Sequence, residues 1–372
     1  MTTTDFLQVP NQYPALQVAL IGYGGAGRIF HAPLISGVPG LQLNCIVTSQ
    51  QTAVQNDWSD ARCVANASAA LADPAIDVVV IATPNASHFE LAQSALNAGK
   101  HVVVDKPCTV TLAETDCLLD LAQARGRVLT VFQNRRFDSD FLALQQVIQS
   151  GALGRVVQVD SHFDRYRPTV PVRWREQAVP GSGLWLDLGP HLLDQALTLF
   201  GLPDDICLDL ATLRDGAQVN DWFHAVLRYT TRHAGLRVVL HASTLVAELG
   251  PRWAVHGTQG SFTKFGLDTQ EDALKTGQRP QLHDLNGWGT DPQAGELLRF
   301  ETIPGVPNPL AVRRAAPNPP GNYLNYYAQL RDHLWGLVPE PLVTPGQVRA
   351  VMQLLSLGEQ SATQGRFVAV RA

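Results

Sequence analysis

The chain has 372 residues, 45% hydrophobic and 16% charged, with a formal net charge of −5. That length exceeds what one hydrophobic core usually fills, so we expect two domains. Without a basic run longer than two arginines or a long apolar stretch, we expect neither a nucleic-acid partner nor a membrane span. The first residues lack signal-peptide features, and the five scattered cysteines contain no C-x-x-C pair. We therefore expect reduced thiols, a cytoplasmic location and no metal site.

The first predicted strand, 16–21, runs into a glycine-rich turn that opens a helix near Arg28. The turn has the spacing G-x-G-x-x-G between a strand and a helix, which is typical of dinucleotide binding. Gly22 permits the tight turn, Gly24 lets backbone N–H groups approach a pyrophosphate, and Gly27 lets helix and strand pack closely. The helix N-terminus then faces the anion. The predicted cofactor residues here are Gly22, Tyr23, Gly24, Gly25, Ala26, Gly27 and Arg28.

The second predicted strand, 41–47, is followed by Thr48, Ser49 and Gln50, which stand where a dinucleotide-binding fold contacts the adenosine ribose. An acid at this point favours NAD, because it bonds the ribose hydroxyls and repels a 2′-phosphate. No acid occurs before Asp57, which favours NADP slightly. No lysine or arginine stands there to pair the phosphate, so NAD stays open as the alternative.

Two further strands are predicted to end at the same edge of a parallel sheet. The strand over 75–82 is followed by a helix over 87–98, and Val102-Val-Val-Asp-Lys-Pro107 is stopped by its proline. Lys106 therefore stands at a carboxyl end, where open α/β sheets build their sites. A helix over 112–125 and a strand over 128–132 complete this half. The cofactor residues predicted here are Thr83, Pro84, Asn85, His88, Asp105, Lys106, Pro107 and Asn134. Turn and capping chemistry explains Asn85 equally well, and His88 is interpreted as a local capping or surface histidine rather than a catalyst.

By these motifs the chain resembles the Gfo/Idh/MocA oxidoreductases, relatives of glucose–fructose oxidoreductase and inositol dehydrogenase. The resemblance rests on the glycine turn followed by Phe30-His-Ala-Pro-Leu34, on Ala82-Thr-Pro-Asn85, and on Lys106-Pro107. It continues through Gly181-Ser-Gly-Leu-Trp-Leu-Asp-Leu-Gly-Pro-His191 and Thr344-Pro-Gly-Gln-Val348. The family usually has Glu before the lysine, where this chain has Asp105. NADP-using members often have Arg after the second-strand serine, where this chain has Gln50. The resemblance implies an α/β fold: a Rossmann domain, then an α+β domain with a large, mostly antiparallel sheet.

The second half is predicted to be such a sheet domain, because alternating strands follow one another on short connections. Strands are expected over 156–163, 206–213, 222–230, 236–243, 252–256 and 261–265. Residues 266–321 are rich in proline and glycine, so we expect a long ordered loop region there. Helices over 323–337 and 347–364 and a short strand over 366–370 close the chain. The domains are accordingly expected to comprise residues 15–134 and 135–372.

Asp187-Leu-Gly-Pro-His191 is the second feature that indicates chemistry. Pro190 suits the first turn of a helix, and residues four apart share a helix face. A capping aspartate and a buried histidine are the structural alternative. Beside the lysine and the glycine turn we favour catalysis, with His191 as the acid/base, Lys106 stabilising alkoxide charge, and Asp187 orienting substrate or imidazole.

Substrate contacts are predicted for Lys106, Arg135, Tyr166, Trp174, Asp187 and His191. An equally good interpretation is that the arginines around Tyr166 and Trp174 are solvated or pair with carboxylates.

These inferences predict an NAD(P)-dependent oxidoreductase that interconverts a secondary alcohol and a ketone on a sugar, inositol or related polyol. The alternatives are a non-catalytic NAD(P)-binding sensor, which should lose the lysine or histidine, and an NAD-dependent glycoside-cleaving enzyme. A methyltransferase that binds a nucleoside cofactor at the glycine turn is a third alternative, but it requires an acidic residue after the second strand, and this chain has none there. By resemblance, a homodimer or homotetramer is expected through the exposed face of the second sheet.

Overall fold

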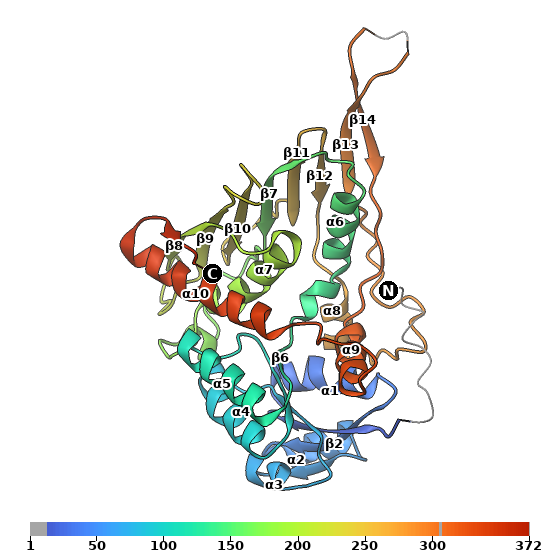
Figure 1. Ribbon diagram of the computed structural model, residues 1–372, viewed down its shortest axis with the longest axis vertical. Helices are drawn as coiled ribbons and strands as arrows, with labels where there is room; N and C mark the ends of the chain where they lie inside the picture. The colour runs from blue at the N-terminus through green and yellow to red at the C-terminus, as the bar shows by residue number, and fades with distance from the viewer. Residues whose placement is uncertain (1–12, 305–306, 372) are drawn as a thin grey trace. The chain divides into compact units, whose positions relative to one another are not determined.

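The structure is a computed structural model that describes residues 13–304 and 307–371 (Figure 1). The N-terminal residues in which a signal peptide was not expected lie outside the described residues. The chain forms two compact units. The first unit contains the described residues up to Asn134, with Gln270–Trp288 and Asn322–Met352. The second contains Arg135–Thr269, Gly289–Gly321 and the described residues from Gln353 onward.

The first unit is built on a parallel sheet with the strand order β3-β2-β1-β4-β5-β6. Its strands are β1 (Leu16–Ile21), β2 (Leu41–Val47), β3 (Arg62–Val64), β4 (Val78–Ile81), β5 (His101–Val104) and β6 (Leu129–Val131). Its helical elements are η2 (Gly27–His31), α1 (Ala32–Ser36), α2 (Gln51–Asp57), α3 (Ala67–Leu71), η3 (Asn85–Ser87), α4 (His88–Asn97), α5 (Leu112–Arg125), α8 (Gln270–Lys275) and α9 (Leu324–Leu334). The strands β4 and β5 are almost wholly apolar and buried, as strands covered on both faces must be. The helices α4 and α5 lie side by side over one face (Figure 1).

The second unit is built on a nine-stranded sheet with the order β14-β13-β12-β11-β7-β10-β9-β8-β15. Its strands are β7 (Val156–His162), β8 (Asp205–Ala211), β9 (Trp222–Arg228), β10 (Arg237–Ser243), β11 (Trp253–Gly257), β12 (Gly260–Lys264), β13 (Glu296–Glu301), β14 (Leu310–Ala315) and β15 (Val368–Ala369). The helical elements are η4 (Asn134–Phe137), which spans the unit boundary, α6 (Ser139–Gln149), η5 (Trp174–Glu176), α7 (Leu184–Phe200) and α10 (Pro345–Gln364), which begins in the first unit.

The helix α7 packs on one face of this sheet, against β9 and β10. On that face Trp185 meets Phe223 edge to face, with ring centroids 5.0 Å apart. Strand residues alternate between buried and half-buried, as they do when only one face is covered. We call the other face, with Trp222, His224, Val239 and His241, the open face.

Two expectations for the second half were wrong in detail. Residues 266–321 are not one loop region, because they contain α8, β13 and β14. Pro190 lies inside α7 rather than in its first turn, since the helix begins at Leu184. The expected mostly antiparallel sheet is confirmed: β7 pairs with β10 in parallel, and the other strand pairs of this sheet in the described residues are antiparallel.

The units also differ in extent from the two ranges that we expected. The first boundary falls between Asn134 and Arg135, but two later segments belong to the first unit. The Oε1 atom of Gln270 anchors them, because it accepts hydrogen bonds from the Trp288 indole at 3.0 Å and the Tyr323 backbone at 2.7 Å.

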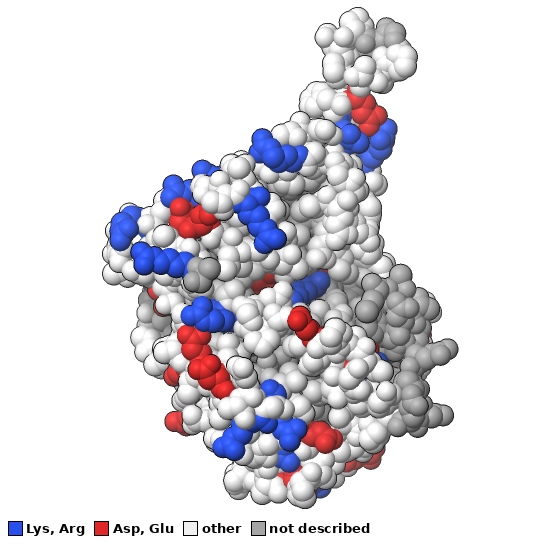
Figure 2. Space-filling model, in the orientation of Figure 1, with Lys and Arg blue, Asp and Glu red and all other residues white. Residues whose placement is uncertain are grey.

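None of the described helices combines the length and apolarity that a membrane crossing needs. On the face drawn in Figure 2, acidic and basic side chains are interspersed in both units rather than gathered into one basic surface.

Candidate active site

The glycine turn after β1 contains two glycines that the fold requires and two that face open space. Gly22 has φ +99°, and a Cβ atom there would lie 2.6 Å from the Ala82 carbonyl oxygen. A Cβ atom on Gly27 would lie 2.1 Å from the Gly22 carbonyl oxygen. At Gly24 and Gly25 an added Cβ atom would meet no protein atom within 4 Å. The turn therefore has room for a ligand against its backbone, which fits the pyrophosphate of a dinucleotide.

Sheet topology places this turn where a dinucleotide site is expected. The chain leaves β1 toward β2 on one side, and β4 lies on the other side of β1. A crevice forms at such a reversal, outside the carboxyl ends of the strands. All the cofactor residues predicted in the first unit, from Gly22 to Asn134, follow the ends of these parallel strands or open the next helix.

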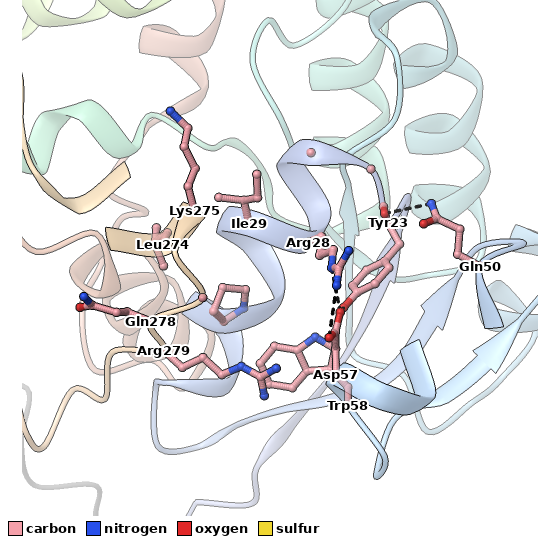
Figure 3. Close-up of a pocket in the computed structure, with 14 residues that line it drawn as sticks. Tyr23, Arg28, Ile29, Gln50, Asp57, Trp58, Leu274, Lys275, Gln278 and Arg279 are labelled. Atoms are coloured by element: carbon pink, nitrogen blue, oxygen red, sulfur yellow. Dashed lines mark hydrogen bonds and ion pairs between the residues drawn. The ribbon is translucent and has the colours of Figure 1, made fainter. Parts of the chain in front are cut away.

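The end of β2 is tied to the glycine turn by polar side chains. The Gln50 amide donates to the Tyr23 carbonyl at 3.2 Å, and the Gln50 backbone donates to Thr48 Oγ1 at 3.2 Å. The Tyr23 hydroxyl donates to Asp57 at 2.8 Å, and Arg28 pairs with the same carboxylate at 2.8 Å (Figure 3). Burial of Asp57 opposes its ionisation, but these hydrogen bonds outweigh it and hold the pKa of Asp57 below its usual value. Asp57 is therefore an ionised group already matched by Arg28.

A cavity of about 580 Å³ opens beside the turn. It is lined by Gly24, Gly25 and Arg28 and, from the segment around α8, by Lys275 and Arg279. The Arg279 guanidinium lies 4.0 Å from the ring centroid of Trp58 (Figure 3). Sequence analysis missed Lys275 and Arg279, because nothing in a segment some 250 residues further along the chain indicates that it returns to the first unit.

The ends of β4 and β5 present the remaining polar groups predicted for the cofactor. Asn85 is only 4% exposed, and Thr83 Oγ1 accepts a hydrogen bond from Ser87 at 2.7 Å. Asp105 Oδ1 accepts from the Lys106 backbone at 2.8 Å, and Lys106 is half-buried before a cis bond to Pro107. Pro84 precedes η3, and Asn134 is buried after β6.

His88 is not a surface histidine, which corrects one of our two interpretations. Its ring is fully buried, with Nδ1 3.0 Å from the Pro107 carbonyl and Nε2 3.0 Å from the Thr83 carbonyl. Burial lowers the pKa of His88. The residue links the chain after β4 to the chain after β5, and so positions the residues around Lys106.

In the second unit, α7 carries both residues of the D-x-x-x-H pattern one turn apart. Asp187 lies in the first turn and is half-buried, and His191 is 6% exposed in the next. Asp187 does not cap the helix, because the N-cap residue is Gly183. It pairs instead with Arg175, whose Nε lies 3.3 Å from the carboxylate.

Arginine side chains gather around Asp187. A small cavity there is lined by Arg165, Arg167, Arg173 and Arg175, together with Asp187. Arg214 supports the lining, since it pairs with Glu176 at 2.6 Å and Asp221 at 2.8 Å. Part of this set therefore pairs with carboxylates, as one interpretation of the sequence expected.

The three other predicted substrate residues are dispersed within the second unit. Arg135 is buried, pairs with Asp138 at 3.2 Å and lies over the Phe163 ring. Trp174 has Arg175 4.5 Å from its ring centroid. Tyr166 is 59% exposed and bridges to Leu245, and it does not line the cavity beside Asp187.

Two family models match the chain. Residues 16–133 match the oxidoreductase family with an NAD-binding Rossmann fold, and residues 141–263 match the GFO/IDH/MocA C-terminal domain.

Similar proteins match over nearly the whole length. The uncharacterized oxidoreductase YdgJ of Escherichia coli is 51% identical over 347 residues, covering 93% of this chain and 96% of its own. The scyllo-inositol 2-dehydrogenase (NADP(+)) IolW of Bacillus subtilis is 34% identical over 362 residues and 95% of each chain. Among solved structures, the YPO2259 protein of Yersinia pestis has a TM-score of 0.89 and 48% identity, covering 96% of this chain and 98% of its own.

Proposed function

Because the chain belongs to the Gfo/Idh/MocA family of NAD-binding oxidoreductases, we propose that it interconverts a secondary alcohol and its ketone on a sugar, an inositol or a related polyol. The observation that carries this proposal is that Asp187 and His191 lie on consecutive turns of α7. The inositol substrate named for the Bacillus subtilis relative supports the substrate class.

The glycine turn, with its two positions open to a ligand, fits an NAD(P) cofactor. When bound, the nicotinamide supplies hydride chemistry at the alcohol carbon. The protein has to manage the hydroxyl proton and the charge on oxygen. His191 takes the proton as the alcohol is oxidised and returns it in the reverse direction.

Lys106 donates a hydrogen bond to the reacting oxygen and stabilises its developing negative charge. Asp187, with Arg175 against its carboxylate, orients the substrate hydroxyls. Arg135, Tyr166 and Trp174 remain proposed substrate contacts, and Tyr166 has the least support from its surroundings.

Steady-state turnover of Lys106→Met and His191→Asn tests these roles. Each variant should lose about 10²–10⁴-fold in kcat/KM, the usual size of an acid–base or oxyanion contribution. NADPH dissociation constants measured in parallel separate lost turnover from lost cofactor binding. His256→Asn is the matched control, because His256 Nδ1 pairs with Ser261 at 2.8 Å on another strand. A Lys106→Met enzyme with full turnover would exclude the lysine role.

The substrate panel should contain inositols, aldoses and simple glycosides. Turnover of a free polyol supports the dehydrogenase, whereas release of an aglycone with catalytic NAD indicates glycoside cleavage. Cofactor binding without turnover on any of them would favour the sensor.

NADP is proposed as the preferred cofactor, because the cavity beside Gly24 is lined by cationic side chains that could pair with a 2′-phosphate. Arg28, Lys275 and Arg279 line it with one carboxylate, Asp57, which Arg28 already pairs. A 2′-phosphate could pair with Arg279, whose guanidinium lies over the Trp58 ring at 4.0 Å from its centroid. Loss of one charge-assisted bond should weaken NADPH binding about 10-fold or more in Arg279→Ala and leave NADH binding unchanged. Arg62→Ala is the control, since Arg62 is exposed on β3 and pairs with Asp73. Equal effects on both cofactors would contradict the assignment.

The proposal extends to assembly and location. A homodimer or homotetramer would cover the open face, where Trp222, Val226 and Val239 are half-buried. The five cysteines are free, which fits a reducing cytoplasm.

A further inference from the structure

Three histidines form a row across neighbouring strands of the open face. His162 on β7 is in register with His241 on β10, and His241 is in register with His224 on β9. Asp164, two residues after His162, reaches the same place. None of these residues is used by the proposed reaction.

The spacing of these groups suits a metal ion. Nδ1 of His162 lies 3.1 Å from Oδ2 of Asp164, and Nε2 of His241 lies 3.5 Å from Oδ1. One ligand atom from each residue lies within 4.8 Å of the other two. Zinc–nitrogen and zinc–oxygen bonds of about 2.1 Å in a tetrahedral site separate ligand atoms by about 3.4 Å. The cluster therefore requires little rearrangement to hold such an ion.

A carboxylate between two imidazoles also occurs without any metal, but that arrangement leaves one buried carboxylate oxygen without a hydrogen bond. The Asp164 side chain is 8% exposed and that of His241 is 13% exposed. Oδ1 of Asp164 is buried and accepts no hydrogen bond from the described residues, and its 3.5 Å contact with Nε2 of His241 is an ion pair only when that imidazole is protonated. Buried polar atoms are nearly always hydrogen-bonded, so this carboxylate oxygen beside an imidazole nitrogen is free to bind a ligand.

There is space beside the cluster for an ion with water. His162 and Asp164 line a cavity of about 40 Å³ with Gly250 and Gly266. One water needs about 10–15 Å³ of such volume. Arg252 also lines the cavity and opposes a cation, although Ser161 and Gln195 accept its hydrogen bonds at 2.6 and 2.8 Å.

We propose that His162, Asp164 and His241 bind one divalent transition-metal ion of the zinc type, with its other coordination positions open to water. Two imidazoles and one carboxylate form a donor set that such ions favour over calcium or magnesium. The ion would join β7 to β10 and thereby stabilise the centre of the sheet. His241 lies about 80 residues beyond His162 and Asp164 in the chain, so the sequence does not indicate that the three residues form one metal site.

Calorimetric titration of the full chain with Zn²⁺, after chelator treatment, tests the proposal. One ion should bind per chain, and Co²⁺ in its place should give the visible absorption of a four-coordinate site with nitrogen ligands. Removing one ligand, in His241→Ala or Asp164→Asn, should weaken binding by at least about tenfold. Both variants should keep the NADPH affinity of the wild-type protein, which separates this site from the proposed reaction.

Two controls make the result specific. His256→Ala removes an open-face histidine outside the cluster and should bind Zn²⁺ like wild type. Cys117→Ser removes an exposed thiol that could bind zinc by itself, and it should not change the affinity. Absence of one-site binding, or an affinity that Asp164→Asn and His241→Ala leave unchanged, would overturn the proposal. Because Asp164→Asn is nearly isosteric, its thermal unfolding shows whether the fold is retained.

Discussion

Gly22 and Gly25 belong to one turn, but alanine should affect them differently. Alanine at Gly22 meets a carbonyl at 2.6 Å and a φ of +99°, so we expect a loss of about 2 kcal/mol or more in unfolding free energy. Alanine at Gly25 meets no protein atom, so stability should be retained. Its methyl group would instead approach the proposed pyrophosphate and weaken NADPH binding about tenfold or more. Urea unfolding and fluorescence titration separate the two outcomes; unchanged binding by Gly25→Ala would contradict the cofactor position.

His31 should make the protein sensitive to acid. Burial lowers the pKa of His31 from 6.5 to about 4, although Asp105 partly opposes the shift. The unfolded chain therefore binds a proton between these values and the folded protein does not. The stability contribution is complete above pH 6.5 and decreases as the pH falls toward 4, by about 3 kcal/mol in all.

The variant His31→Gln should flatten this dependence. Chemical unfolding at pH 4, 5.5 and 7 gives the slope, which is compared rather than the absolute stability, since Nδ1 of His31 also lies 2.6 Å from the Tyr327 hydroxyl. His101 has a pKa lowered to about 4 as well and should retain part of the slope. The exposed His283→Gln is the control. An equal slope in His31→Gln and wild type would show that His31 titrates normally.

At the scale of elements, α5 shows how completely a local signal can define a helix. The helix spans Leu112–Arg125, the range predicted from the sequence. Thr111 Oγ1 accepts from the Glu114 backbone at 3.2 Å, and the Glu114 carboxylate accepts from the Thr111 backbone at 3.0 Å. This capping box satisfies two amide groups that the first turn leaves open.

Removal of the cap should therefore weaken the fold measurably. We expect Thr111→Ala to lower the unfolding free energy by about 1 kcal/mol, whereas Thr111→Ser, which keeps the hydroxyl, should lose much less. Urea unfolding of both variants measures the difference. Identical losses in the two would show that the methyl group, rather than the hydroxyl, stabilises the helix.

Elements without such signals were the ones that sequence analysis missed. The strands β13 and β14 contain no buried residue and lie at one edge of the sheet, so their sequences lack a buried face to give an alternating pattern. The helix α8 has only six residues. Pro190 was placed in a first turn because proline is commonest there, but α7 begins at Leu184, more than a full turn upstream.

At the scale of the whole molecule, the open face of the nine-stranded sheet carries the proposed assembly. Val239 lies in the middle of β10 on that face. A buried charge without a partner is costly, so Val239→Glu should dissociate the proposed oligomer into monomers. Light scattering after size-exclusion chromatography gives the mass, and NADPH binding should persist because Val239 belongs to the second unit. A wild-type protein that is already monomeric would contradict the oligomer.

The sequence by itself determined the local chemistry of this protein. The glycine turn, the buried strands with their polar ends, the capped helix α5 and the spacing of Asp187 and His191 are all short-range patterns, because turns, pleats and helices repeat over a few residues. The tertiary structure alone decided what residues far apart do together. It returned Lys275 and Arg279 to the cavity beside Gly24, buried His88 between two loops, and aligned His162 with His241. Such contacts depend on how whole elements pack, and no pattern along the chain records that packing.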